Sequence, residues 1–212
     1  MNTSTSRSTF QVGDVIKDSY TLAKLIGAGT FGSIFCSFYR SENGTRLVAV
    51  KLERNIEQYP MLYNEVVVLK ALTGNKHFAR FYQYGTHKDY KFIAMELLGS
   101  NMIDLVNRKR PYKFSLHSVL KFGIQAIESL QALHQAGFVH RDIKPGNFVI
   151  GNSRSTTGTF FLIDFGLCKR LNIKDGVVVN PVKKGNFRGT MMYASLNAHY
   201  KNELGRNDDL MR

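Results

Sequence analysis

Hydrophobic and polar residues alternate along much of the first hundred positions of the chain. A period of two with many β-branched and aromatic residues is typical of β-strands, and glycine-rich or polar turns separate the alternating segments. We therefore expect a five-stranded antiparallel sheet. Its strands are predicted at Tyr20–Ile26, Ser33–Tyr39, Leu47–Leu52, Phe78–Tyr84 and Lys91–Leu97.

The apolar spacing becomes helical in two places. Pro60–Leu72 repeats leucine and valine at helical spacing behind a proline, which predicts one helix packed on the sheet. Ser115–Ala136 places its large aliphatic residues on one face, with Ser115 as the expected cap and Gly137 as the expected stop. Two short strands are predicted after it, at Phe148–Ile150 and Phe160–Ile163.

Composition adds a strong positive charge to this picture. The 212 residues are 43% hydrophobic, enough for a core, and 29 Lys and Arg against 16 Asp and Glu give a formal charge of +13. Such a surface attracts anions, although a solvated basic surface that aids solubility is an equal alternative. We do not expect nucleic acid as the partner, because no groove-reading motif accompanies the charge.

The cysteines and the N-terminal residues indicate in which cellular compartment the protein is expected. Cys36 and Cys168 lie far apart and form neither a disulfide framework nor a metal-ligand spacing. Residues 1–18, rich in Ser and Thr near the start, are expected to form a flexible tail. With no apolar stretch long enough for a signal or a membrane span, we expect an intracellular protein, cytoplasmic or also nuclear, with no membrane attachment.

Two short strings carry the candidate chemistry. They are His140-Arg141-Asp142-Ile143-Lys144-Pro145-Gly146-Asn147 and, after a brief apolar run, Asp164-Phe165-Gly166. Asp142 is expected to accept a hydroxyl proton and Lys144 to stabilise a transferring phosphoryl group. Asn147 and Asp164 are the expected magnesium ligands. The strings are typical of a protein kinase active site.

Structural alternatives exist for several residues of these strings. His140 would then be a core histidine with its hydrogen bonds satisfied, Arg141 a loop cap and Phe165 an ordinary core residue. The catalytic interpretation is favoured because the other parts that phosphoryl transfer needs lie upstream in the expected order.

One of these parts is a glycine-rich segment between two predicted strands. A dinucleotide-binding fold would need a helix directly after the glycines, whereas a strand-turn-strand flap covers nucleotide phosphates with backbone N–H groups. We predict such a flap, with a plain glycine-rich hairpin as the alternative. Its residues are Gly27, Ala28, Gly29, Thr30, Phe31, Gly32 and Ser33, followed by Ile34.

The second upstream part is a charged pair. Lys51 ends the string Val48-Ala49-Val50-Lys51 in the third predicted strand, where an ammonium group could contact the α- and β-phosphates. Glu65, in the middle of the predicted helix, is its expected partner. The alternative is a surface salt bridge worth less than about 1 kcal/mol.

With these motifs in place, the chain resembles a Ser/Thr protein kinase of the casein kinase 1 group. The strings Met95-Glu96-Leu97-Leu98-Gly99 and Tyr193-Ala194-Ser195-Leu196-Asn197-Ala198-His199 are similar to the hinge and the activation-segment end of that group. The strings Phe187-Arg188-Gly189-Thr190 and Gly205-Arg206-Asn207-Asp208-Asp209-Leu210 look most like the tau-tubulin kinase branch.

The resemblance implies an α+β, two-lobed fold and a dependence on ATP and Mg²⁺. The N-lobe would span residues 19–98, and residues 99–212 would form a partial, mainly helical C-lobe, since the family continues with further helices beyond Arg212. Ile26, Ile34 and Ala49 would enclose the adenine base. Met95 would guard the pocket behind it, and the backbones of Glu96 and Leu98 would hydrogen-bond the base.

The chain also departs from the family pattern. Gly146 stands where casein kinase 1 enzymes carry Asp and tau-tubulin kinases Ser, and Met192 stands where these families present an arginine that binds a phosphorylated substrate. Asp209 matches a buried aspartate that braces the His-Arg-Asp backbone. With its helix cut at the first turn, we expect exposed apolar surface and low stability.

Two functions remain open at this point. The first is a protein kinase that acts on Ser or Thr near acidic residues, which the basic activation segment would select through Lys169, Arg170, Lys174, Lys183, Lys184 and Arg188. The second is a catalytically impaired protein that binds nucleotide as a scaffold or competitor. The sequence leaves the oligomeric state open.

Overall fold

The computed structural model describes residues 10–29, 32–42, 44–55, 61–108, 110–174, 177–179 and 186–212. Two compact units make up the chain: Met1–Leu62 with Arg80–Leu97, and Tyr63–Ala79 with Leu98–Arg212. The predictions for Thr30, Phe31, Pro60, Lys183 and Lys184 lie outside the described residues.

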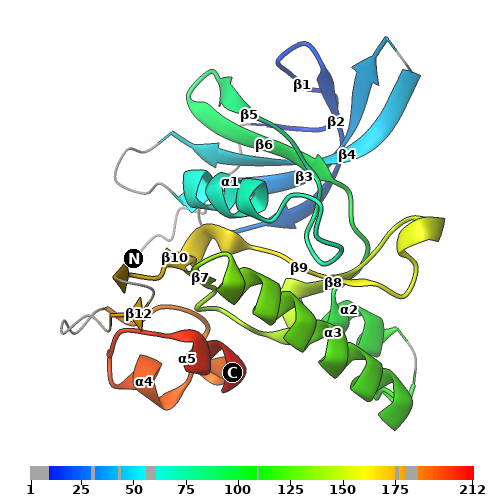
Figure 1. Ribbon diagram of the computed structural model, residues 1–212. Coiled ribbons are helices and arrows are strands. Elements are labelled where there is room, and N and C mark those ends of the chain that lie inside the picture. The colour runs from blue at the N-terminus through cyan, green and yellow to red at the C-terminus, as the bar shows by residue number, and fades with distance from the viewer. Residues whose placement is uncertain are drawn as a thin grey trace, which may run out of the picture. The chain divides into compact units, whose positions relative to one another are not determined.

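The first unit is a curled antiparallel sheet with the strand order β1-β2-β3-β4-β6-β5 (Figure 1). All five predicted strands are present, the fourth of them shifted to Phe81–His87, and β3 pairs with β4 along the whole length of β3. The sheet therefore accounts for the β part of the predicted α+β class. Its strands are β1 (Val15–Ile16), β2 (Tyr20–Ala28), β3 (Gly32–Ser41), β4 (Gly44–Arg54), β5 (Phe81–His87) and β6 (Tyr90–Glu96).

A sixth strand, β1, arises from the segment that was expected to be a tail. Lys17 and Asp18 adopt positive φ angles of 49° and 56°, and this turn lets Val15–Ile16 pair with the start of β2. Ile16 is fully buried and Phe10 is 7% exposed. The prediction is corrected for residues 10–18 because these two apolar side chains, isolated in sequence, complete the hydrophobic core of the sheet.

Close strand packing explains one glycine of the predicted phosphate flap. A Cβ atom at Gly32 would lie 2.0 Å from the backbone oxygen of Leu52 on β4, so only glycine fits there. At Gly29, by contrast, a Cβ would meet nothing within 4 Å. Gly32 thus has a structural reason to be glycine that is independent of any ligand.

Helices and short strand pairs build the second unit. The helices are α1 (Met61–Ala71, shared at its start with the first unit), α2 (Met102–Asn107), α3 (Leu116–Gln135), α4 (Leu196–His199) and α5 (Arg206–Leu210). The strand pairs are β7 (Phe138–Val139) with β10 (Lys169–Arg170), β8 (Phe148–Ile150) with β9 (Phe160–Leu162), and β11 (Ile173–Lys174) with β12 (Val177–Val178). Among the described residues, none of these helices has the length and apolar character that crossing a membrane requires.

The long helix α3 begins and ends as predicted, and most of its aliphatic face is exposed, as the expected exposed apolar surface requires. The Ser115 side chain accepts the N–H of Ser118, and Gly137 follows the helix with a φ of +85°. Most of the predicted apolar face is exposed in the structure, with buried side chains only at Leu130 and Leu133. The exposed members of that face are Leu116, Val119, Leu120, Ile124 and Ile127.

A second stripe of α3 packs on the β8–β9 hairpin instead. The ring of Phe122 meets Phe148 and Phe160 edge to face, at 5.0 and 5.2 Å between centroids. Gln125 Nε2 donates to Gly158 O, and Gln125 Oε1 accepts the N–H of Phe160. The hairpin therefore lies against α3 (Figure 1), beside the segment that carries the candidate site.

Candidate active site

The loop between β7 and β8 brings three of the predicted site residues together. Lys144 Nζ donates to Asp142 Oδ2 at 2.7 Å, and Asn147 Nδ2 donates to the backbone oxygen of Asp142 at 2.8 Å. A short 3₁₀ turn, Pro145–Asn147, makes this possible, because it folds the chain back before β8. Asp142 and Asn147 are each 5% exposed, so the cluster is largely shielded from water.

Thr190 completes the cluster from a distant part of the chain. Its backbone N–H and its hydroxyl both donate to Asp142 Oδ1 at 2.8 Å, and Lys144 Nζ donates to the hydroxyl oxygen at 2.7 Å. Sequence reasoning used Thr190 only as part of a family string and gave it no role. A threonine directly after Gly189 in a polar segment is too common a pattern to mark it.

These contacts control the charge of Asp142 and leave it room to accept a proton. Burial raises the pKa of the carboxyl group, but the hydrogen bonds from Lys144 and Thr190 outweigh burial and hold the pKa below its usual value. A carboxylate offers about four acceptor positions, and these short hydrogen bonds use three. The fourth acceptor position is on Oδ2. Among the described residues, the only other donor near it is Asn147 Nδ2, at a longer distance of 3.5 Å.

His140 has the structural role that was given as an alternative to a catalytic one, that of a core histidine with its hydrogen bonds satisfied. The side chain is fully buried, its Nδ1 accepts the N–H of Asp142 at 3.2 Å, and its Nε2 lies 3.1 Å from Ile163 O. Burial lowers the pKa of His140, which favours the neutral ring with the proton on Nε2. His140 thus shapes the loop by holding the backbone of Asp142.

Asp209 fixes the backbone of the same loop from α5. Its carboxylate is 1% exposed and accepts the N–H groups of His140 at 2.7 Å and Arg141 at 2.8 Å. His134 Nε2 on α3 lies 2.9 Å from the same carboxylate. Burial raises the pKa of Asp209, but these hydrogen bonds, first that of His134, bring it below its usual value.

The second string follows β9 and lies next to Asn147. The backbone N–H of Ile163 donates to Asn147 O at 3.0 Å, and Asp164 adopts a left-handed conformation with φ 67°. Phe165 is 1% exposed, with ring centroids 5.8 Å from Phe78 and 5.5 Å from His140. Its packing anchors the string in the core of the unit. This agrees with the alternative interpretation of Phe165 as an ordinary core residue.

The predicted metal ligands suit a hard divalent cation. Because the amide nitrogen of Asn147 points to Asp142 O, its Oδ1 is the atom that would ligate a metal, and Asp164 would add a carboxylate oxygen. Mg²⁺ binds through one or two such oxygens and keeps water or phosphate for the other positions. Within the described part of the chain, no group of three or more His, Cys, Asp or Glu could hold a metal ion.

The predicted nucleotide residues divide between the two units. Those of the first unit lie on neighbouring strands: Ile26, Gly27 and Ala28 on β2 with Gly29 just after it, Gly32, Ser33 and Ile34 on β3, Ala49 and Lys51 on β4, and Met95 and Glu96 on β6. In the sheet register, Lys51 stands opposite Ile34 on one side, and Ala49 opposite Met95 on the other. The sheet therefore gathers them in one region.

Glu65 and Leu98 belong to the second unit. Glu65, on α1, is 3% exposed, which argues against its alternative as half of a surface salt bridge. Because Lys51 lies in the other unit, its pairing with Glu65 stays a prediction. Glu96 uses its backbone N–H for Arg80 O at 2.8 Å, so only its carbonyl would be left for a base.

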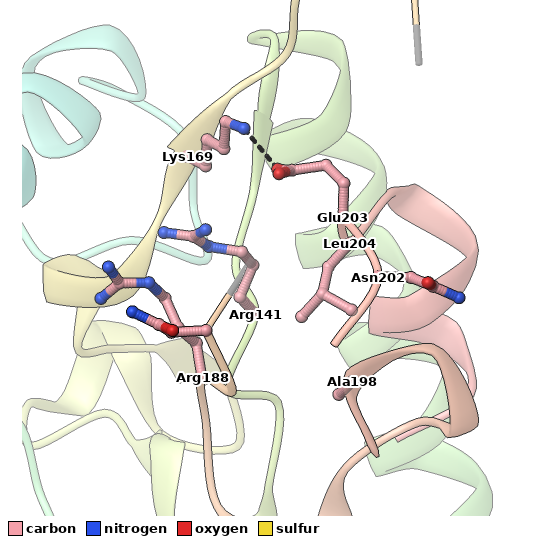
Figure 2. Close-up of a pocket in the computed structure, with 8 residues that line it drawn as sticks. Arg141, Lys169, Arg188, Ala198, Asn202, Glu203 and Leu204 are labelled. Carbon is pink, nitrogen blue, oxygen red and sulfur yellow. Dashed lines mark hydrogen bonds and ion pairs between the residues drawn. The ribbon is translucent and has the colours of Figure 1, made fainter. Parts of the chain in front are cut away.

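A pocket of about 350 Å³ lies beside the loop between β7 and β8 (Figure 2). Arg141 and Arg188 project their guanidinium groups toward the same side of it, and Lys169 pairs with Glu203 across it. Burial lowers the pKa of Arg141, and the charge of Arg188 lowers it further. Lys169 is one of the basic residues predicted to select acidic sequences. In the structure its ammonium group is already paired with the Glu203 carboxylate.

Comparison with known proteins agrees with this geometry. The sequence model of the protein kinase domain family matches residues 20–209. A probable serine/threonine-protein kinase of Dictyostelium discoideum is 43% identical over 201 residues, which are 95% of this chain. The chain spans 40% of the length of that relative.

Proposed function

Because the chain belongs to the protein kinase domain family, we propose that it is a protein serine/threonine kinase that transfers the γ-phosphoryl group of ATP to protein hydroxyls. The observation that carries this proposal is the hydrogen-bonded cluster of Asp142, Lys144, Asn147 and Thr190. It holds an ionised carboxylate, whose fourth acceptor position meets, among the described residues, only a 3.5 Å contact from Asn147, next to an ammonium group. A hydroxyl nucleophile and an anionic phosphoryl group need this combination.

Each residue of the cluster has a separable role in the proposed reaction. Asp142 Oδ2 orients the substrate hydroxyl and accepts its proton, and Lys144 stabilises the negative charge that develops on the transferring group. Thr190 and Asn147 hold these two side chains in position. Because the transition state is loose, most of the rate gain comes from positioning and charge.

The remaining predicted residues would bind the nucleotide. Asn147 and Asp164 would hold Mg²⁺, whose positive charge offsets that of the phosphates. Lys51, oriented by Glu65, would contact the α- and β-phosphates, and the backbone of the Gly27–Ser33 segment would cover them. Ile26, Ile34, Ala49 and Met95, with the backbones of Glu96 and Leu98, would enclose the adenine.

We further propose a specificity like that of the casein kinase 1 group, in its tau-tubulin kinase branch, for Ser or Thr near acidic residues. The strings of the hinge and of the activation segment support the branch. The formal charge of +13 supports acidic partners. Since Glu203 neutralises Lys169, exposed Arg170 and Arg188 are better candidates for these contacts.

Transfer of labelled phosphate to casein by the full chain tests the proposal. We expect Asp142→Asn to lower the rate at least about 100-fold, because it removes the proton acceptor. The matched control is Asp89→Asn, on an exposed turn of the first unit. Equal rates for wild type and Asp142→Asn, or no transfer by wild type, would contradict the proposed activity.

A thermal-shift titration with Mg²⁺-ATP separates the kinase from the alternative scaffold. An increase in Tm that is lost in Lys51→Met, together with transfer to casein, supports the enzyme. The same increase without transfer would favour a nucleotide-binding scaffold or competitor.

A further inference from the structure

The side chain of Arg212 lies against the segment that leads into Thr190. Its Nη2 donates to the backbone oxygen of Arg188 at 3.3 Å. A Cβ atom added at Gly189 would lie 2.3 Å from Arg212 Nη1 and 2.6 Å from Arg141 O. The guanidinium group, the glycine and the backbone of the β7–β8 loop therefore meet at one point, with no space for a side chain between them.

The guanidinium group of Arg212 is buried at a cost. Its Nε and Nη1 are shielded from solvent and have no hydrogen-bond partner among the residues that the structure describes. Burial lowers the pKa of Arg212, and the charges of Asp209, Asp142 and Asp208 oppose that effect. An arginine side chain stays protonated in proteins, so a positive charge is held here. Buried polar atoms without partners are rare in native structures, and functional sites are where such a cost is expected.

The segment that Arg212 contacts continues directly into the cluster around Asp142. Thr190 follows Gly189, and its N–H and hydroxyl both donate to Asp142 Oδ1 at 2.8 Å. The same hydroxyl accepts from Lys144 Nζ at 2.7 Å. Glycine restricts its own backbone less than any other residue, and Gly189 adopts a φ of +102°. The contact with Arg212 restrains the backbone at this permissive position.

We propose that Arg212 is a positioning residue for phosphoryl transfer. Its guanidinium group packs on Gly189 and bonds the carbonyl oxygen of Arg188. These contacts hold Thr190 on Asp142, the expected proton acceptor. The inference rests on the proposed kinase activity and adds to it a residue that acts through Thr190. Loss of Arg212 should therefore slow the transfer step and leave the binding of protein substrate nearly unchanged.

Steady-state transfer of labelled phosphate to casein by the full chain tests this role. Arg212→Met keeps a long, unbranched side chain but removes the charge and the donors. We expect kcat to fall at least about tenfold, with the KM for casein within about twofold of wild type. The matched control is Arg206→Met, which removes the same charge from an exposed position of α5 and should keep the wild-type kcat.

A double-mutant cycle with Thr190→Val separates positioning from a general loss of stability. Residues that act through one another have effects that do not add. Once Thr190→Val has removed the hydroxyl contacts, Arg212→Met should lower kcat little further. If the two losses multiply in full, Arg212 acts independently of Thr190 and the inference is overturned.

Amide hydrogen exchange keeps the inference separate from the activity. The N–H of Thr190 should exchange faster in Arg212→Met than in wild type or Arg206→Met, because its bond to Asp142 is held less firmly. Transfer by wild type, together with an unchanged kcat or an unchanged Thr190 amide in Arg212→Met, would overturn the inference and leave the kinase proposal standing. Faster exchange in a protein that transfers no phosphate would overturn the kinase proposal alone. Unchanged exchange without transfer would overturn both.

Discussion

Asp209 and Asp208 are neighbouring buried carboxylates of α5 with different partners, and this allows a sharp test of how the loop between β7 and β8 is supported. Asp209→Asn keeps the shape of the side chain but removes its charge. The carboxylate accepts three hydrogen bonds, from the N–H groups of His140 and Arg141 and from His134. An amide can accept at one oxygen only, and its NH₂ group would face a donor.

The expected loss follows from these contacts. Hydrogen bonds to a charged group contribute about 1.5–3 kcal/mol each, and a buried donor without a partner costs about 1–3 kcal/mol. Asp209→Asn would lose the hydrogen bond from the N–H of Arg141 and leave that buried donor facing NH₂, which should lower the free energy of unfolding by about 3–5 kcal/mol. With a typical urea slope of about 2 kcal/mol/M, the midpoint should fall by about 2 M.

Urea unfolding followed by far-UV circular dichroism measures the midpoint, and amide hydrogen exchange locates the effect. In Asp209→Asn the amides of His140 and Arg141 should exchange much faster, because their acceptor is weakened. Asp208→Asn is the control, since Asp208 accepts from Ser195, Asn197 and Gly205 instead. It should also lower the midpoint but leave those two amides protected.

The pH dependence of the stability tests the same supporting role of Asp209. The pKa of Asp209 is depressed in the fold, so its contribution to stability is present above the unfolded value of about 3.9 and is lost as the pH falls through the folded value. Asp209→Asn should remove this part of the acid dependence. An unchanged midpoint together with unchanged exchange of the His140 and Arg141 amides would refute the bracing role.

Three further substitutions test other parts of the structure. Gly189→Ala should lower the urea midpoint, because Gly189 has φ +102° and a Cβ there would lie 2.6 Å from Arg141 O; an unaltered midpoint would contradict this. Phe165→Ala should cost about 3–5 kcal/mol in the same assay, as expected for a buried aromatic ring, and a loss below about 1 kcal/mol would show that the site is loosely packed. Burial raises the pKa of Tyr20 to about 12, so its contribution to stability, present below pH 10, should be lost as the pH rises through about 12. Ultraviolet titration should show a late tyrosine that is missing in Tyr20→Phe, and titration of every tyrosine near pH 10 would contradict it.

The strands and the long helix were predictable because their signals are local. Alternation in β2 to β6 and the cap at Ser115 depend on a few neighbouring residues, and the structure contains each of these elements. Strand β1 was missed because its signal is two apolar residues, Phe10 and Ile16, whose burial depends on side chains far along the chain. Periodicity placed the aliphatic residues of α3 on one face, and the exposure of most of that face agrees with the expected exposed apolar surface.

In the candidate site, too, the residues with local sequence signals were predictable and those that depend on distant parts of the chain were not. Asp142, Lys144 and Asn147 lie within six residues, so a short string was enough to group them. The partners that fix them come from elsewhere, and pairings such as Thr190 with Asp142 or Glu203 with Lys169 have no local signature. Sequence therefore grouped these three neighbouring residues but missed the Thr190 and Glu203 side chains, which contact the region from distant parts of the chain.

The hydrogen bonds to Asp209 also set an order in time. His140 and its acceptor are 69 positions apart in the chain, so the loop cannot reach its final geometry until the ribosome has made that whole stretch. At about 5–20 residues per second, this takes about 3–14 seconds. During that interval the nascent chain carries the complete His-Arg-Asp string without the carboxylate that accepts its backbone N–H groups.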